Sequence, residues 1–134
     1  MSAFFESKKV MRLSAWSFAI ALGFAAAAAS AGKMDVKLSG DQEVPPVNSS
    51  GAGSGTITIN DDGSVSGSDT ATGFTPTAAH IHHAAAGKNG PVIVPFTKEG
   101  DKFSAPAGAK LTADQMKAYK GGEIYVNVHS AAYP

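Results

Sequence analysis

The sequence contains no cysteine, so no disulfide bond can hold the fold together and no lipid can be attached through a cysteine thiol. Arginine is nearly absent as well, because only Arg12 among the 134 residues carries a guanidinium group. Arginine is the preferred group for bidentate recognition of phosphate, and the lysines form no basic stripe, so nucleic acid is not an expected partner. A small domain without disulfide bonds must depend on its own core or on a bound ion.

The amino-terminal segment has the pattern of a secretory signal peptide. Three basic residues, the last of them Arg12, precede an uncharged apolar stretch over residues 13–29, and Ala29-Ser30-Ala31 is a small-residue cleavage site. We therefore predict a cleavable signal peptide over residues 1–31 and a secreted or periplasmic location. The alternative is a retained membrane anchor, because the apolar stretch approaches the length of a spanning helix.

Removal of the predicted signal peptide would leave a mildly acidic domain over residues 32–134. The full chain has eleven acidic and eleven basic residues, and the segment removed contains one acid and three bases. Ten acids and eight lysines remain, which gives a net charge of −2 with neutral histidines. The mature form is not expected to span a membrane.

Short stretches of alternating apolar and polar residues predict many β-strands. Asn60-Asp61-Asp62-Gly63 is a strong hairpin turn signal between two of them. Gln42 to Val47 contains two adjacent prolines, which cannot donate to a sheet, so this segment is expected at an edge or crossing over the fold. The predicted strands cover residues 34–38, 56–59, 64–68, the histidine segment up to residue 83, residues 92–96, the vicinity of Phe103, and residues 124–129.

One short helix is predicted after Thr112, where Thr112 and Gln115 match a capping box, and Gly121-Gly122 ends it. Lys98 to Lys102 is interpreted as a charged turn. The apolar run 92–96 is predicted to be a strand covered on both sides, except that Pro95 makes its far end an edge or a bulge. The predicted fold class is all-β: an antiparallel, Greek-key-like β-sandwich with one short helix.

Three histidines are predicted to share one face of a sheet. In an extended strand Ile81 marks the core side, so His80 and His82 point to the opposite side. In the last strand Val128 and its apolar alternates mark the core side, so His129 also points outward, whereas His83 does not. If the two strands are neighbours, three neutral imidazoles meet at an open, solvent-facing site.

This arrangement suits Zn(II) or Cu(II), and the order of metal affinities favours copper. The predicted metal ligands are His80, His82 and His129, with His83 as an alternative ligand. Glu43 is a weaker candidate, which could accept a hydrogen bond from one imidazole and orient it. The alternatives are that the histidines only form hydrogen bonds with carbonyl or carboxylate groups, and that Glu43 is a solvated charge.

The motifs of the chain resemble, in order, those of the CHRD domain, named after chordin. They are the segments 38–47, Ala79-His80-Ile81-His82, Gly90-Pro91-Val92, and 121–129. The resemblance implies an exported, β-rich domain, found in bacterial proteins of mostly unassigned function and in an extracellular antagonist of growth-factor signalling in animals. It also implies a fold similar to copper/zinc superoxide dismutase, whose copper is held by a His-x-His strand and a distant histidine. On that likeness the metal positions are again His80, His82 and His129.

The chain departs from the family pattern at its end. Family members usually continue into a Gly-Glu-Ile-Arg-Gly-like motif and a final strand, whereas this sequence stops at Tyr133-Pro134. A domain that lacks this strand is expected to expose a sheet edge, through which a homodimer could form.

Three classes of function are consistent with these observations. The favoured hypothesis is a non-catalytic copper- or zinc-binding domain. The alternative is a structural or adhesive extracellular module that binds another macromolecule without a metal. An enzyme, specifically a superoxide dismutase, is disfavoured because the mature chain has no arginine to attract a small anion and shows no obvious second metal site.

Overall fold

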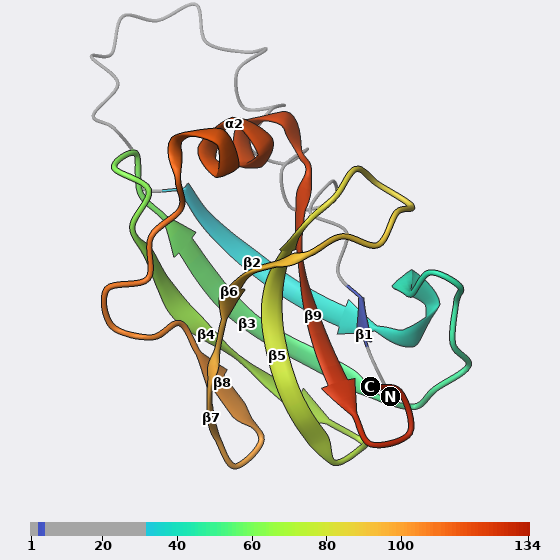
Figure 1. Ribbon diagram of the computed structural model, residues 1–134. Helices are drawn as coiled ribbons and strands as arrows, with labels where there is room; N and C mark the ends of the chain where they lie inside the picture. Colours follow the sequence, from blue (N-terminus) through green and yellow to red (C-terminus); the bar gives the residue numbers. More distant parts are fainter. Residues whose placement is uncertain (1–2, 5–31) are drawn as a thin grey trace, which may run out of the picture.

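The computed structural model describes residues 3–4 and 32–134, and most of the predicted signal peptide therefore lies outside the described residues. Two antiparallel sheets pack face to face (Figure 1). One sheet has the strand order β1-β9-β5-β6, and the other has the order β2-β3-β4-β8-β7. The strands are β1 Ala3–Phe4, β2 Gly32–Ser39, β3 Ala52–Ile59, β4 Val65–Thr72, β5 Pro76–His83, β6 Val92–Pro95, β7 Thr97–Glu99, β8 Lys102–Ser104 and β9 Ile124–Ser130.

This architecture confirms the predicted all-β sandwich with one helix in the described part of the chain. The hairpin turn predicted at residues 60–63 joins β3 to β4, where the Asn60 amide donates to the Ser64 carbonyl at 2.9 Å. The carboxylate of Asp62 accepts hydrogen bonds from both the amide and the hydroxyl of Ser64. Turn chemistry set by neighbouring residues therefore fixes the register of this hairpin, with Ile59 opposite Val65.

Two predictions about the region after residue 90 were wrong. β6 is an edge strand, and its first residue, Val92, is 47% exposed, so it is not covered on both sides. The charged segment predicted as a turn instead contains β7, which pairs with β8 around a tight turn at Gly100. The chain leaves one sheet after Pro95 and enters the other at Thr97, so β6 and β7 close one side of the sandwich.

The helix α2, Ala113–Gly121, begins with the predicted capping box. The Thr112 hydroxyl accepts from the Gln115 amide at 3.2 Å, and the Gln115 side chain accepts from the Thr112 amide at 2.8 Å. Gly122 ends the helix in a left-handed conformation, with φ at 79°. The helix lies across one end of the sandwich (Figure 1) and buries Ala118 against the core. No helix among residues 32–134 is long and apolar enough to cross a membrane.

The core fills the space between the two sheets. It is built from aliphatic side chains of almost every long strand together with Phe103, which is fully buried. In β9, Ile124, Val126 and Val128 belong to this core, and the residues between them do not. This agrees with the side of the strand that the alternation of apolar residues predicted to face inward. The members of the core are Met34, Val36, Leu38, Ile57, Ile59, Val65, Ala71, Ala79, Ile81, Val94, Phe103, Leu111, Ala118, Ile124, Val126 and Val128.

The segment with two prolines belongs to neither sheet. After β2 the chain forms a short 3₁₀ helix, Gly40–Gln42, and the Gly40 carbonyl then accepts hydrogen bonds from the Glu43 and Val47 amides. The Val44–Pro45 peptide bond is cis. The Asn89 side chain donates to the Val44 carbonyl at 3.1 Å. This contact ties the segment to the loop between β5 and β6, next to the histidine-bearing strand.

Candidate metal centre

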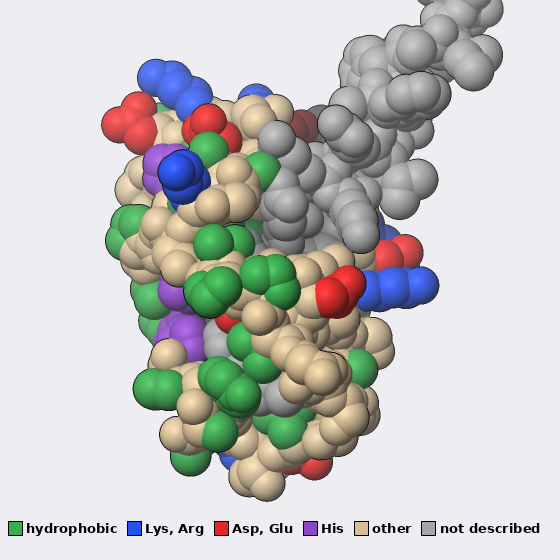
Figure 2. Space-filling view, turned by 90° about the vertical axis from the view of Figure 1, so that its right-hand side faces the viewer, with side chains coloured by type: hydrophobic (Ala, Val, Ile, Leu, Met, Phe, Trp, Pro, Cys, Tyr) green, Lys and Arg blue, Asp and Glu red, His purple; other side chains and the backbone are tan. Residues whose placement is uncertain are grey.

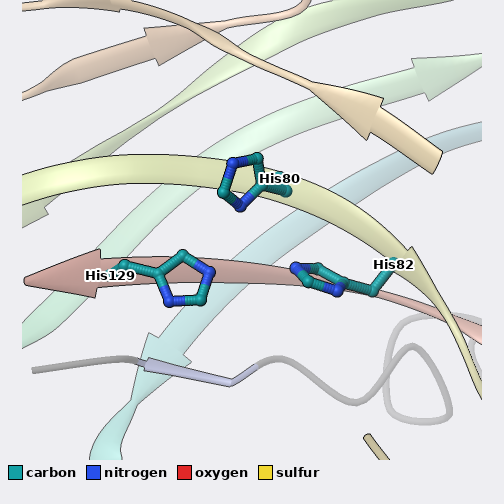
Figure 3. Close-up of side chains that lie close together, drawn as sticks. All are labelled: His80, His82 and His129. Carbon is teal, nitrogen blue, oxygen red and sulfur yellow. The ribbon is translucent and has the colours of Figure 1, made fainter. Parts of the chain in front are cut away.

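The pairing of β5 with β9 brings the three predicted histidines together. His80 lies opposite Asn127, His82 opposite Tyr125, and Ala78 opposite His129. Side chains at directly opposite positions of an antiparallel pair point to the same face of the sheet. The three imidazoles therefore project from one face (Figure 3), on the side away from the buried core.

The rings lie close enough to share an ion. One ligand nitrogen from each of His80, His82 and His129 can be chosen so that all three lie within 4.8 Å of one another. The ring centroids are 5.0 Å apart for His80 and His129, 5.5 Å for His80 and His82, and 6.0 Å for His82 and His129. The sequence predicted this convergence only on the condition that the two strands are neighbours, and they are.

Within residues 32–134, one buried ring nitrogen of each of the three histidines has no hydrogen-bond partner: Nδ1 of His80, Nε2 of His82 and Nδ1 of His129. The other nitrogen of His82, Nδ1, lies 2.8 Å from the Gly90 carbonyl oxygen. A carbonyl only accepts, so Nδ1 carries the proton and Nε2 carries the lone pair. Buried polar nitrogens without a partner are unfavourable, and the lone pair on His82 Nε2 is available to a cation.

The site is more enclosed than the predicted open, solvent-facing surface. His82 is only 8% exposed, and its neighbours on the same face, Tyr125 and Asn127, are 4% and 6% exposed. His80 and His129 are half-buried, and Figure 2 shows histidine side chains reaching the molecular surface. Alternation along a strand indicates which face is away from the core, but it does not show which distant residues, such as Gly90, contact that face.

Burial keeps the three rings neutral. Desolvation is the main cause that lowers the pKa of each, because a charged imidazolium is poorly solvated there. The pKa of His129 falls to about 4, and the neighbouring His80 and His82 rings lower it further after desolvation. For His82 the hydrogen bond with the Gly90 backbone acts in the opposite direction. At neutral pH the rings therefore have free lone pairs and can act as ligands without first losing a proton.

The donor set fits copper or zinc. Imidazole nitrogen binds both metals, with Zn–N bonds of about 2.0–2.1 Å. Two such bonds span at most about 4.2 Å, so a pair of nitrogens at the full 4.8 Å would have to close by at least about 0.6 Å on binding. Small rotations of the imidazole side chains can supply this movement. Three protein ligands would leave a further coordination position open.

The CHRD domain family matches residues 34–134, a range that includes all three histidines and nearly all of both sheets. This chain belongs to the CHRD domain family. The motifs that suggested the resemblance thus lie in one matched region rather than in scattered fragments. Searches of curated proteins and of solved structures found no match.

The two weaker candidates, His83 and Glu43, lie outside the cluster of three histidines. His83 lies opposite Ile124, outside the cluster of three, and its Nε2 is 3.9 Å from a carboxylate oxygen of Glu123. Glu43 lies near Tyr125, where its charge contributes to raising the pKa of the tyrosine, after the larger effect of burial.

Two residues that contact His82 were not identified from the sequence. The Tyr125 ring stacks on the His82 ring, with centroids 5.0 Å apart and planes 5° from parallel. The Gly90 carbonyl accepts a hydrogen bond from His82 Nδ1, and the Gly90 amide donates one to the Tyr125 hydroxyl at 2.8 Å. The alternation along the last strand already placed Tyr125 on the same face as His129, and this signal could have identified it. Nothing local to Gly90 indicated its role.

Proposed function

We propose that this CHRD domain is exported and binds one copper or zinc ion through His80, His82 and His129 without catalysing a reaction. The observation that supports this function is the convergence of His80, His82 and His129, each of which offers one ring nitrogen within 4.8 Å of the other two. Their lowered pKa values add to it, because neutral rings do not need to be deprotonated before they bind.

Copper is the favoured ion where both metals are available, because a given nitrogen site binds Cu(II) more tightly than Zn(II). The sequence has no cysteine, so a thiolate-rich zinc or iron–sulfur site cannot form and imidazole is the available ligand. A binding role is favoured over dismutation because no arginine follows Arg12 in the sequence, so no guanidinium is available there to attract a small anion to the metal.

Isothermal titration of the purified protein with Cu(II) and with Zn(II) tests the proposal. We expect saturable binding of one ion per chain, strongly weakened in His80→Ala and in His129→Ala. His83→Ala is the matched control, because it removes an imidazole from the same strand but outside the cluster. Absent binding, or binding that His83→Ala weakens as much as the other two, would overturn the proposal. Absent binding would instead favour a structural or adhesive module.

A further inference from the structure

We infer that Tyr125 and Gly90 position His82 as a metal ligand and select which of its nitrogens faces the ion. This inference rests on the proposed function, but it concerns residues outside the ligand set. Its starting point is the β5–β9 pairing, in which His82 and Tyr125 are directly opposite one another. Their rings are stacked and nearly parallel, so Tyr125 limits rotation of the imidazole from one side.

Gly90 holds the imidazole through its backbone. The Gly90 carbonyl accepts from His82 Nδ1 at 2.8 Å, and the Gly90 amide donates to the Tyr125 hydroxyl at 2.8 Å. A side chain on residue 90 would collide with the carbonyl oxygen of His83, so the backbone can come this close only as glycine. The two hydrogen bonds and the stacked pair of rings form a closed arrangement of three residues.

This arrangement decides the chemistry of His82. A neutral imidazole has one proton, and the Gly90 carbonyl keeps that proton on Nδ1. The lone pair is then on Nε2, the nitrogen that is buried without a partner beside the other two rings. Hydrogen bonds of this kind to a metal-binding histidine fix its tautomer and its orientation. Without the carbonyl in place, the proton could move to Nε2 and the ligand would be lost.

The loop that carries Gly90 is itself anchored on both sides. The His83 amide donates to the Pro91 carbonyl at 3.0 Å, and the Asn89 side chain donates to the Val44 carbonyl at 3.1 Å. The Tyr125 hydroxyl is the anchor nearest the site, because it holds Gly90 directly. Tyr125 is 4% exposed, so water is a poor replacement for this hydroxyl.

Tyr125→Phe tests the inference, because it keeps the stacked ring and removes only the hydroxyl. Nitrogen-15 spectra of the histidine rings in the metal-free protein report the tautomer directly. In the wild type we expect His82 to carry its proton on Nδ1 and the Gly90 amide to exchange slowly with solvent. In Tyr125→Phe we expect a mixture of tautomers, faster exchange at Gly90, and about tenfold weaker metal binding. Tyr119→Phe is the matched control, since it removes a hydroxyl near Gly32 and away from the site, and should change none of these.

The outcomes separate this inference from the proposed function. If Tyr125→Phe keeps the wild-type tautomer and affinity, the positioning role is overturned even when His80→Ala abolishes binding. If the wild type binds no metal, the proposed function is overturned, and the tautomer comparison still decides whether Tyr125 and Gly90 orient His82. Measurements on the wild type are also decisive. A His82 proton on Nε2, or a rapidly exchanging Gly90 amide, would contradict the positioning role without contradicting metal binding.

Discussion

Asp69 lies directly opposite Gly55 in the β3–β4 ladder, and a Cβ atom on residue 55 would collide with the Asp69 Cα atom. Since the two strands can approach this closely only without a side chain at position 55, Gly55→Ala must push β3 and β4 apart. We expect it to lower the free energy of unfolding by roughly 1–3 kcal/mol, measured by urea denaturation.

Gly121→Ala is the control for this substitution. Its new methyl group would meet only ordinary contacts, the nearest being the Glu123 side chain at 3.9 Å, and Gly121 is the last residue inside the helix α2. We expect a neutral or slightly stabilising effect there, of up to about 1 kcal/mol. Equal effects of the two alanines would mean that close strand approach at Gly55 is not important for stability.

Asp69 itself should make stability depend on pH. Its side chain is 1% exposed, and neither carboxylate oxygen has a hydrogen-bond partner of good geometry in the part of the chain that the structure describes. Burial raises the pKa of Asp69 from 3.8 to about 7, against a smaller lowering by its own backbone amide. Its cross-strand neighbours, Gly55 and Phe103, are uncharged. Between about pH 4 and pH 7 the folded state therefore keeps a proton that the unfolded state loses, and stability falls as pH rises.

The variant Asp69→Asn removes this titration. The difference in unfolding free energy between the variant and the wild type should grow in favour of the variant from pH 4 to pH 7, by up to roughly 4 kcal/mol, and then level off. Taking this difference at each pH cancels the contribution of the histidines, whose lowered pKa values act in the opposite direction. Asp61→Asn, at an exposed turn position, is the control. A pH-independent difference for Asp69→Asn would show that the carboxyl is charged when folded.

Bound metal should stabilise the folded domain. An ion that binds only the folded state adds about 2.7 kcal/mol to the free energy of unfolding at a concentration one hundred times its Kd. Thermal unfolding with added Cu(II) or Zn(II) should therefore shift upward in the wild type and in His83→Ala. The shift should be lost in His129→Ala and reversed by a chelator. An equal shift in all three proteins would point to nonspecific binding.

The edge of β9 is the expected surface for self-association. β9 has neither a charged residue nor a proline, whereas the edge strand β2 carries exposed Lys33 and Lys37, β6 ends in Pro95, and β7 is short and charged. Charges and prolines protect sheet edges against pairing with another chain. In the full chain β1 pairs with only two residues of this edge, Asn127 and Val128.

If residues 1–31 are removed as predicted, β1 is lost and the whole edge becomes available to a second copy. Light scattering after size exclusion should then show a concentration-dependent dimer for the processed chain and a smaller dimer fraction for the unprocessed one. Val92→Lys, on the edge strand β6, should leave this dimer intact. A processed chain that remains monomeric at all concentrations, or a dimer that Val92→Lys abolishes, would argue against the β9 edge.

Features that depend on neighbouring residues could be predicted from the sequence. The turn at residues 60–63, the capping box at Thr112, and the side of the strand to which His80 and His82 point all follow from spacing within a few positions. β7 was missed because its charged residues form a strand only through pairing with β8. Composition alone gave no signal for that pairing.

Strand alternation and motif order were enough to predict that three imidazoles point away from the core and that the chain resembles a CHRD domain. The tertiary structure decided that β5 and β9 are neighbours, in a register that brings His129 beside His80. It also decided that Gly90 and Tyr125 contact His82, and that the Asp69 carboxyl group is buried between strands. These facts depend on contacts between segments far apart in the chain, which form because whole sheets bury their apolar faces together, and no short stretch of residues contains that information.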